Sequence, residues 1–291
     1  MKEKISIFLK GFLMGICDVI PGVSGGTIAF ITGIYSRLIN AIKSVSFSTI
    51  SGLIKPIFKR DEKSRSSFKE SFKKLDLLFL TILFIGIASA IFIGSGVMEF
   101  LLENYFTYTI VLFIGLILAS SRIIYQNIHN HNIKNISFGF IGFFIGILLS
   151  IVIPLDINPN LPYIFLGGFL AISAMFLPGI SGAFILLIMG LYKFMLKIIH
   201  DISNNLTYFL VFILGAIIGA LSISRLISFL FRKDKCKTLY VLLGLIIGSL
   251  SIPLKKVYYS GFSWNFLNTA AVLIIFSIGF FTVNIIEKKT R

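Results

Sequence analysis

A Pro-Gly-x-Ser-Gly motif interrupts two apolar segments of this chain, and no other feature constrains the fold as strongly. The first copy runs from Pro21 to Thr27 (PGVSGGT) and the second from Pro178 to Ala183 (PGISGA). Proline removes a backbone donor and clashes with the preceding helical turn, while glycine permits backbone angles that other residues avoid. Both segments are therefore predicted to be helices broken inside an apolar environment.

The composition identifies that environment as a membrane. Charged residues make up only 13% of the 291 residues and hydrophobic residues 56%, whereas a soluble domain carries about 25% charged residues. Several apolar runs approach the roughly 20 residues that cross a bilayer as a helix. The net charge of +15 arises between these runs, so it predicts orientation in the membrane and no nucleic-acid partner. Cys17 and Cys236 lack Cys or His neighbours, so neither a metal site nor a cofactor is expected.

The two motifs belong to an internal repeat. At an offset of 157, eight of the 15 positions from Pro21 to Tyr35 are identical. The chain therefore divides into two related halves, residues 1–153 and 154–291. The first half is predicted to hold a re-entrant broken helix at 12–35, a basic cytoplasmic linker at 36–76 and spans at about 77–98, 108–128 and 137–153. The second half is predicted to hold a re-entrant segment at 163–192 and spans at about 206–231, 238–252 and 264–286.

The charge distribution predicts the orientation of the halves. Three spans separate the two re-entrant segments, and an odd number of crossings inverts the second half. With the N-terminus inside, the inside segments hold 22 Lys and Arg residues and the outside segments four, as the positive-inside rule requires. The predicted fold is an all-α integral membrane protein with two inverted-topology repeats, each a re-entrant broken-helix hairpin plus three transmembrane helices. We expect a multi-pass protein of the cytoplasmic (plasma) membrane with both termini cytoplasmic, a pattern typical of secondary transporters.

The repeated motif has the chemistry of an anion site. A half-helix is expected to begin near Ser24 and another near Ser181, and the first N–H groups of a helix have no partner within it. An anionic group satisfies these donors, aided by the positive end of the helix dipole. The alternative for the motifs is that they only permit close helix packing. Arg225 is a candidate to counter the charge of the anion, and the alternative is that its side chain extends to the membrane interface. The candidate substrate-binding residues are Pro21, Gly22, Ser24, Gly25, Gly26, Thr27, Pro178, Gly179, Ser181, Gly182 and Arg225.

Asp18 lies just before the first break, and Met175 is its counterpart in the second half. An ionisable residue at this depth in a membrane is a functional candidate. Since a carboxylate repels a phosphate, Asp18 is assigned to ion coupling, with a proton or Na⁺ as the coupling ion. The alternative is a carboxylate that the backbone N–H groups of the break satisfy locally.

These segments resemble a known family. The ranges Gly15–Tyr35 (GICDVIPGVSGGTIAFITGIY), Leu177–Gly182 (LPGISG) and Gly190–Tyr192 (GLY) are similar to the polyprenyl-phosphate transporter family, and the resemblance covers nearly the whole chain. It implies a lipid flippase that returns undecaprenyl phosphate from the outer to the cytoplasmic leaflet, for reuse in cell-wall synthesis. Ser36 and Lys193 depart from the family pattern, in which an acidic residue often follows Gly-x-Tyr in each half. Membrane lipids are the other expected partners, and the sequence leaves a homodimer open.

Two other functions fit parts of the pattern. An integral membrane undecaprenyl-pyrophosphate phosphatase also carries Pro-Gly-x-Ser, but an Arg follows, where this chain has Gly25 and Gly182. A phosphatase needs charge stabilisation and an acid or base at the phosphorus, and the apolar runs contain no paired glutamates. An ion-coupled carrier of a small anion would use the same two half-helix ends. The sequence thus predicts a transporter and not an enzyme.

Overall fold

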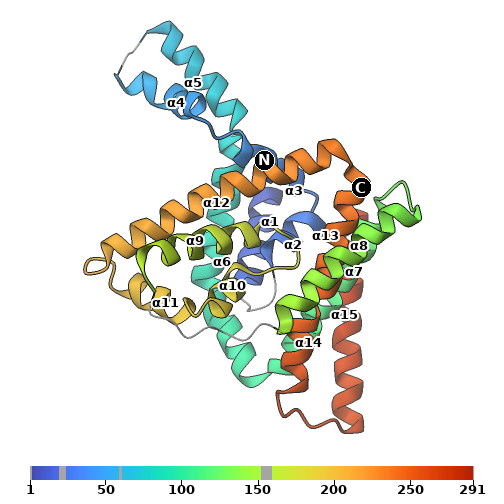
Figure 1. Ribbon diagram of the computed structural model, residues 1–291. Helices are drawn as coiled ribbons and strands as arrows, with labels where there is room; N and C mark the ends of the chain where they lie inside the picture. The colour runs from blue at the N-terminus through green and yellow to red at the C-terminus, as the bar shows by residue number, and fades with distance from the viewer. Residues whose placement is uncertain (1, 20–23, 59–60, 152–158, 291) are drawn as a thin grey trace.

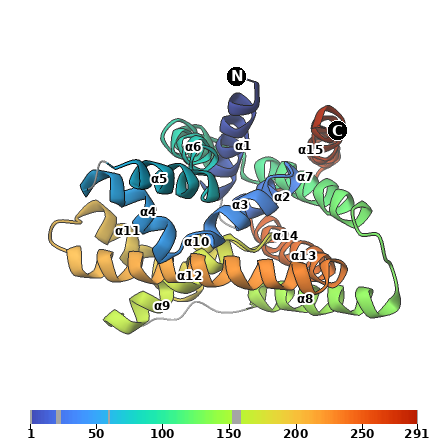
Figure 2. The same ribbon diagram turned by 90° about the horizontal axis from the view of Figure 1, so that it is seen from above.

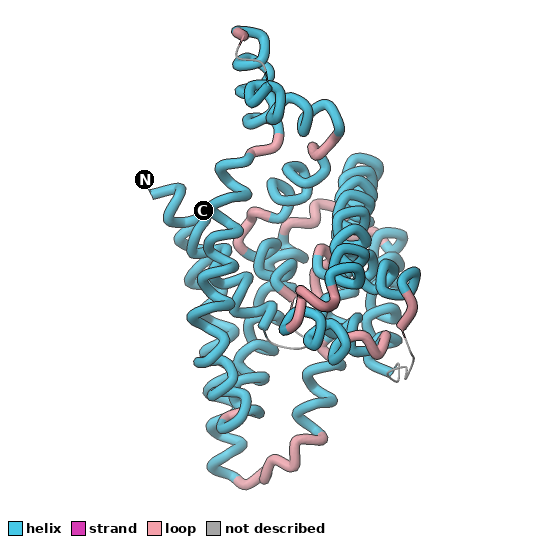
Figure 3. Tube along the Cα trace, turned by 90° about the vertical axis from the view of Figure 1, so that its left-hand side faces the viewer, coloured by secondary structure: helices cyan, strands magenta, loops and turns pink. Residues whose placement is uncertain are grey.

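Every element in the described part of the chain is a helix, which confirms the all-α class. The computed structural model describes residues 2–19, 24–58, 61–151 and 159–290 (Figures 1 and 3). The helices of the first half are α1 (Lys2–Val19), α2 (Gly25–Ile31), α3 (Tyr35–Lys43), α4 (Phe47–Phe58), α5 (Glu62–Lys74), α6 (Leu77–Asn104), α7 (Phe106–Gln126) and α8 (Ile133–Ile151). Those of the second half are α9 (Leu161–Met175), α10 (Gly182–Ile188), α11 (Tyr192–His200), α12 (Leu206–Lys233), α13 (Lys235–Ser249), α14 (Ser251–Tyr258) and α15 (Phe266–Thr290).

Five helical segments in the described residues are long and apolar enough to cross a membrane: α7, α8, α12, α13 with α14, and α15. A sixth is reached when α5 and α6, which meet at a bend of 52°, are taken together. The chain is therefore a multi-pass membrane protein. The span expected at 238–252 begins earlier, at Lys235, and continues to Tyr258 with an interruption at Leu250. Pro253 lies in the first turn of α14, where its missing N–H has no helical partner to lose.

Four helix pairs form the body of the molecule: α1 with α6, α9 with α12, α7 with α15, and α8 with α13. Figure 2 shows α9 beside α12 and α8 beside α13. In lipid no hydrophobic effect drives helices together, so glycines that let backbones approach supply the packing. A β-carbon at any of the following would meet the partner helix backbone: Gly11 and Gly86, Gly168 and Gly215, Gly115 and Gly279, and Gly142 and Gly244, in the order of the pairs above.

Two of these pairs join the halves, because α7 and α8 belong to the first half and their partners to the second. After the re-entrant segments the offset of the repeat becomes 129, which pairs Gly86 of α6 with Gly215 of α12 and Gly115 of α7 with Gly244 of α13. The offset of 157 pairs α1 with α9, and chain order then pairs α8 with α15. Each pair then corresponds to another pair: α1–α6 to α9–α12, and α7–α15 to α13–α8. The described helices of the two predicted halves therefore correspond in order and are interleaved in space.

The predicted inside segments gather at one end of the molecule. The upper end in Figure 1 holds the start of α1, the end of α15, the α4–α5 hairpin and the α7–α8 and α12–α13 connections. The lower end holds the α6–α7 and α14–α15 connections. We call the upper end the basic end, because its segments carry most of the lysines and arginines. The linker expected at 36–76 consists, in its described residues, of three helices, α3 to α5.

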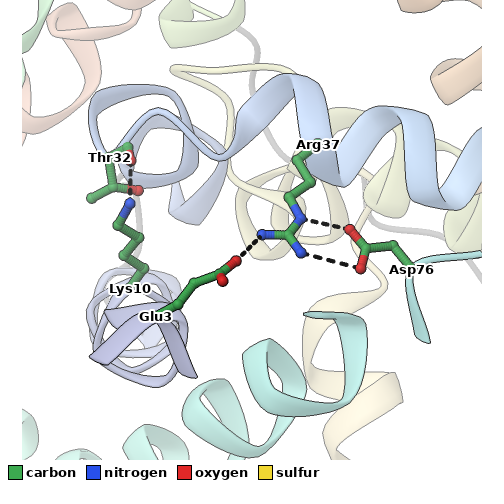
Figure 4. A network of polar contacts seen from close by, with 5 residues as sticks. All are labelled: Glu3, Lys10, Thr32, Arg37 and Asp76. Atoms are coloured by element: carbon green, nitrogen blue, oxygen red, sulfur yellow. Dashed lines mark hydrogen bonds and ion pairs between the residues drawn. The ribbon is translucent and has the colours of Figure 1, made fainter. Parts of the chain in front are cut away.

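Arg37 ties three segments together at the basic end (Figure 4). Its Nε donates to Asp76 Oδ2 at 2.5 Å and its Nη1 to Glu3 Oε1 at 3.1 Å. The guanidinium also lies 4.4 Å from the ring centroid of Phe79. The hydrogen bond to Asp76 is the main reason that the pKa of Arg37 is raised. Asp76 has φ 47°, a left-handed conformation that aspartate tolerates, at the bend between α5 and α6.

Candidate functional site

Both predicted breaks are present as helix ends. One separates α1 from α2, and the other separates α9 from α10. The residues that precede the half-helices, Ser24 and Ser181, have the same extended backbone, with φ and ψ of −116° and 126° and of −96° and 131°. Both half-helices are seven residues long. Two predicted site residues, Pro21 and Gly22, lie outside the described residues.

Each half-helix also ends in the same turn. Gly33 follows α2 with φ 73°, and Gly190 follows α10 with φ 68°. In the first copy the N–H of Ile34 donates to the carbonyl of Ala29 at 3.0 Å, and the second copy has the corresponding bond at 2.8 Å. A left-handed glycine with this bond is the Schellman motif, which satisfies carbonyls at the helix end. The repeated Gly-x-Tyr sequence is thus the signature of this turn.

The two copies of the motif contact each other. The N–H of Gly179 donates to Thr27 Oγ1 at 2.8 Å, in a fully buried bond. Ser24 Oγ donates to the carbonyl of Leu177 at 3.5 Å. Ser24, Thr27 and Ser181 are all buried. The structure therefore places α2 against the second break, with Ser24 and Thr27 making the contacts.

Two charged side chains of α1 hold the two ends of α2. Asp18 Oδ1 accepts a hydrogen bond from the N–H of Gly25 at 2.8 Å, and Lys10 Nζ donates to the carbonyl of Thr32 at 2.7 Å (Figure 4). A carboxylate at the start and an ammonium at the end both complement the helix dipole. Asp18 Oδ2 is buried and has no hydrogen-bond partner among the described residues. The first half-helix is thus fixed at both ends, and one carboxylate oxygen is left over.

The second half-helix lacks both charges. The repeat places Met175 at the position of Asp18 and Gly167 at the position of Lys10. Neither methionine nor glycine carries a charge, so neither can pair with an end of α10 as Asp18 and Lys10 pair with the ends of α2. The two breaks therefore share their backbone geometry but differ in charge. A cation suits the side of Asp18, and an anion suits the start of α10.

Thr27→Val tests the buried bond between the two copies. Valine keeps the volume but removes the acceptor for the N–H of Gly179, and an unsatisfied buried donor costs about 1–3 kcal/mol. We expect the free energy of unfolding in detergent to fall by that amount, as measured by chemical denaturation. Thr282→Val is the matched control, since Thr282 is exposed and its hydroxyl donates to the carbonyl of Ile278 in the preceding turn of α15. Equal losses in the two variants would contradict the assignment.

Comparison with known proteins identifies the relatives of this chain. A family model described as undecaprenyl phosphate translocase-like matches residues 14–265. A polyprenyl-phosphate transporter from Vibrio cholerae is 35% identical over 246 residues, covering 84% of this chain and 76% of the relative. One from Staphylococcus aureus is 30% identical over 290 residues, covering 94% and 92%. The chain belongs to the undecaprenyl phosphate translocase-like family.

The translocase-like family is one of transporters, so this chain is a transporter rather than an enzyme, as the sequence predicts. The family match spans both copies of the motif and the contact between them. No solved structure matches the chain.

Arg225 of this translocase-like chain contacts a different region. Its Nη2 donates to the carbonyl of Val45, in the α3–α4 connection, at 3.3 Å, and its side chain is exposed. One turn further along α12, Ser228 Oγ accepts from Lys43 Nζ at 2.8 Å. These bonds join α12 to the basic end. A role of Arg225 toward an anion stays a prediction.

The sequence patterns do not single out Lys10 or Tyr35. Tyr35 is buried, and its hydroxyl donates to the carbonyl of Phe176, in the second break, at 2.9 Å. Its signal is the repeated Gly-x-Tyr, which is explained by the turn and not by this contact. The signal for Lys10 is its spacing of eight residues from Asp18, since two turns of helix place both side chains on one face.

Proposed function

We propose that this chain is a flippase that returns undecaprenyl phosphate, or a related polyprenyl phosphate, from the outer to the cytoplasmic leaflet for carrier-lipid recycling. The observation that carries the proposal is the contact between the two motif copies through Thr27 and Gly179. It favours one shared site over two separate helix breaks. The names of the relatives supply the lipid class.

In this proposal the headgroup binds where the two motifs meet. The N–H groups at the starts of α2 and α10 and the hydroxyls of Ser24, Thr27 and Ser181 supply the donors. Gly25 and Gly182 are the first residues of the half-helices, and neither places a side chain of its own beside its N–H group. Helix N-termini favour anions through both hydrogen bonds and the dipole. The polyprenyl tail stays in the surrounding lipid while the headgroup crosses.

Asp18 couples headgroup binding to a cation. Its Oδ1 accepts the N–H of Gly25, so a charged carboxylate and a phosphate compete for the same donor. A proton or Na⁺ on Asp18 removes its negative charge and weakens its hold on Gly25. The freed donor then binds the phosphate, and two ligands that assist each other in this way bind cooperatively. A cation gradient would thereby drive the movement of the lipid.

The proposed topology is a pair of inverted repeats with the basic end in the cytoplasm. The excess of Lys and Arg at that end supports this orientation. The correspondence of the helix pairs between the halves supports the repeat. Broken helices that meet at the midplane between inverted repeats are the typical site of secondary transporters.

A reconstituted transport assay tests the function. Vesicles with labelled undecaprenyl phosphate in one leaflet should show protein-dependent movement of the lipid to the other leaflet, without release of phosphate. An ion-coupled small-anion carrier, which would use the same half-helix ends, would instead accumulate inorganic phosphate and leave the lipid in place. Release of inorganic phosphate from undecaprenyl pyrophosphate would contradict the transporter.

A further inference from the structure

The α4–α5 hairpin has a polar interior. The two helices pack against each other, and a β-carbon at Gly52 of α4 would overlap Ser71 Oγ and lie 3.0 Å from Ser67 Oγ of α5. Ser64 and Ser71 of α5 and Thr49 of α4 are buried. At Gly52, the contact between the helices is therefore made by glycine and serine hydroxyls.

The large apolar side chains of the hairpin lie on its outside. Phe47 of α4 is 90% exposed, and Phe68 and Phe72 of α5 are each 39% exposed, with their rings 5.9 Å apart. Ile50 and Ile54 are exposed as well. By helical periodicity Phe47, Ile50 and Ile54 lie on the side of α4 away from α5. A hairpin in water buries such residues, and an exposed apolar patch marks an interaction site.

The charges of the hairpin select the partner. Residues 47–74 hold eight Lys and Arg and three Asp and Glu. Arg65, Lys69 and Lys73 follow Phe68 and Phe72 around α5 by helical periodicity, and all three are exposed. An apolar face flanked by basic side chains is typical of helices that lie in the interface of an anionic membrane. A second copy of this basic hairpin would repel the first.

The position of the hairpin fits the same partner. It projects from the basic end and continues through the 52° bend directly into α6, a predicted span (Figure 1). The contacts of Arg37 fix the base of the hairpin where α6 begins. A helix of 13 residues is only about 20 Å long, so α5 cannot carry its phenylalanines far from the membrane surface.

We propose that the α4–α5 hairpin binds the surface of the leaflet at the basic end, with its Phe and Ile side chains in the interface and its lysines on anionic phospholipid headgroups. This proposal does not depend on which lipid the protein transports. It adds a second lipid contact, with bulk anionic phospholipid, at a hairpin that lies apart from α2 and α10 in Figure 1.

Tryptophan fluorescence of the full chain in vesicles tests the proposal. Trp264 is the sole tryptophan, so a Trp264→Phe background carries a single reporter introduced by Phe68→Trp. In phosphatidylglycerol vesicles we expect a blue-shifted emission that brominated lipids quench strongly. Ser66→Trp is the matched control, because Ser66 is exposed on the other side of α5; its emission should stay red-shifted and be quenched by aqueous iodide.

The dependence of bromolipid quenching on charge distinguishes a lipid surface from other partners of the hairpin. In the reporter chain, replacing Lys55, Lys69 and Lys73 by glutamine should reduce bromolipid quenching in phosphatidylglycerol vesicles, as should about 1 M salt, where the Debye length is about 3 Å. Equal iodide access at positions 66 and 68 in anionic vesicles would overturn the proposal. Quenching that appears only in crosslinked dimers would also overturn it, in favour of a second copy as the occupant.

Discussion

Asp18→Asn should abolish cation-driven accumulation of the lipid while the protein stays folded. Asparagine keeps an oxygen that accepts the N–H of Gly25, so the start of α2 retains its hydrogen bond. It cannot take up a proton or hold Na⁺ as a carboxylate does, so binding of the lipid no longer depends on the cation. Coupling free energies between sites are about 1–3 kcal/mol, so the dependence of lipid affinity on the cation should fall about 5- to 150-fold.

The measurement is lipid movement in vesicles with and without a proton or Na⁺ gradient. Asp18→Ala separates the two roles, since it removes the hydrogen bond as well as the charge. Loss of such a cap costs about 0.5–2 kcal/mol, so the alanine variant should lose stability and the asparagine variant should not. Gradient-driven movement at the wild-type rate in Asp18→Asn would make the carboxylate purely structural, the alternative that the sequence leaves open.

Gly26→Val should remove lipid movement and destabilise the protein. A β-carbon at position 26 would lie 2.6 Å from the carbonyl oxygen of Met175 and 3.2 Å from Ser24 Oγ. Neither the backbone of the second break nor the buried Ser24 can move away without disturbing its own packing. Overpacking of this kind lowers the free energy of unfolding by about 1–3 kcal/mol. Separation of α2 from the second break relieves the overlap, but it breaks the bond between Thr27 and Gly179.

The matched control is Gly96→Val on α6, where a β-carbon would meet nothing within 4 Å. This variant should keep both lipid movement and the midpoint of thermal unfolding in detergent close to wild type. The counterpart of Gly26 in the second half is Ala183, so the restriction arises from the approach of Met175 and not from the motif itself. Transport by Gly26→Val at the wild-type rate would show that the contact between the copies is dispensable.

The local features of the site can be predicted from the sequence because proline and glycine act through their own backbone. Two helix breaks and a half-helix after each serine follow from residue type and from the repeat. The left-handed turns at Gly33 and Gly190 were not predicted, although their Gly-x-Tyr sequence is repeated. The contact between the two copies follows less directly, from the expectation that inverted motifs meet.

Contacts that depend on packing between distant segments are not predictable in this way. Lys10 reads as one of many basic residues near the start of the chain, and only the fold brings its ammonium to the carbonyl of Thr32. The polar interior of the α4–α5 hairpin is equally hidden, since Ser64 and Ser71 read as solvated positions in a basic linker. Hydroxyl side chains are compatible with either environment, so their sequence pattern does not decide which one they occupy.

The interleaving of the halves has a consequence for biosynthesis. The glycine face of α7 at Gly115 meets its partner at Gly279, which the ribosome adds 164 residues later. At about 5–20 residues per second, α7 remains without α15 for roughly 8–33 s. During that interval the inserted first half presents unpaired glycine faces to the bilayer and to the insertion machinery. A truncated product that ends between the halves should therefore be recognised and degraded rather than accumulate as a folded domain.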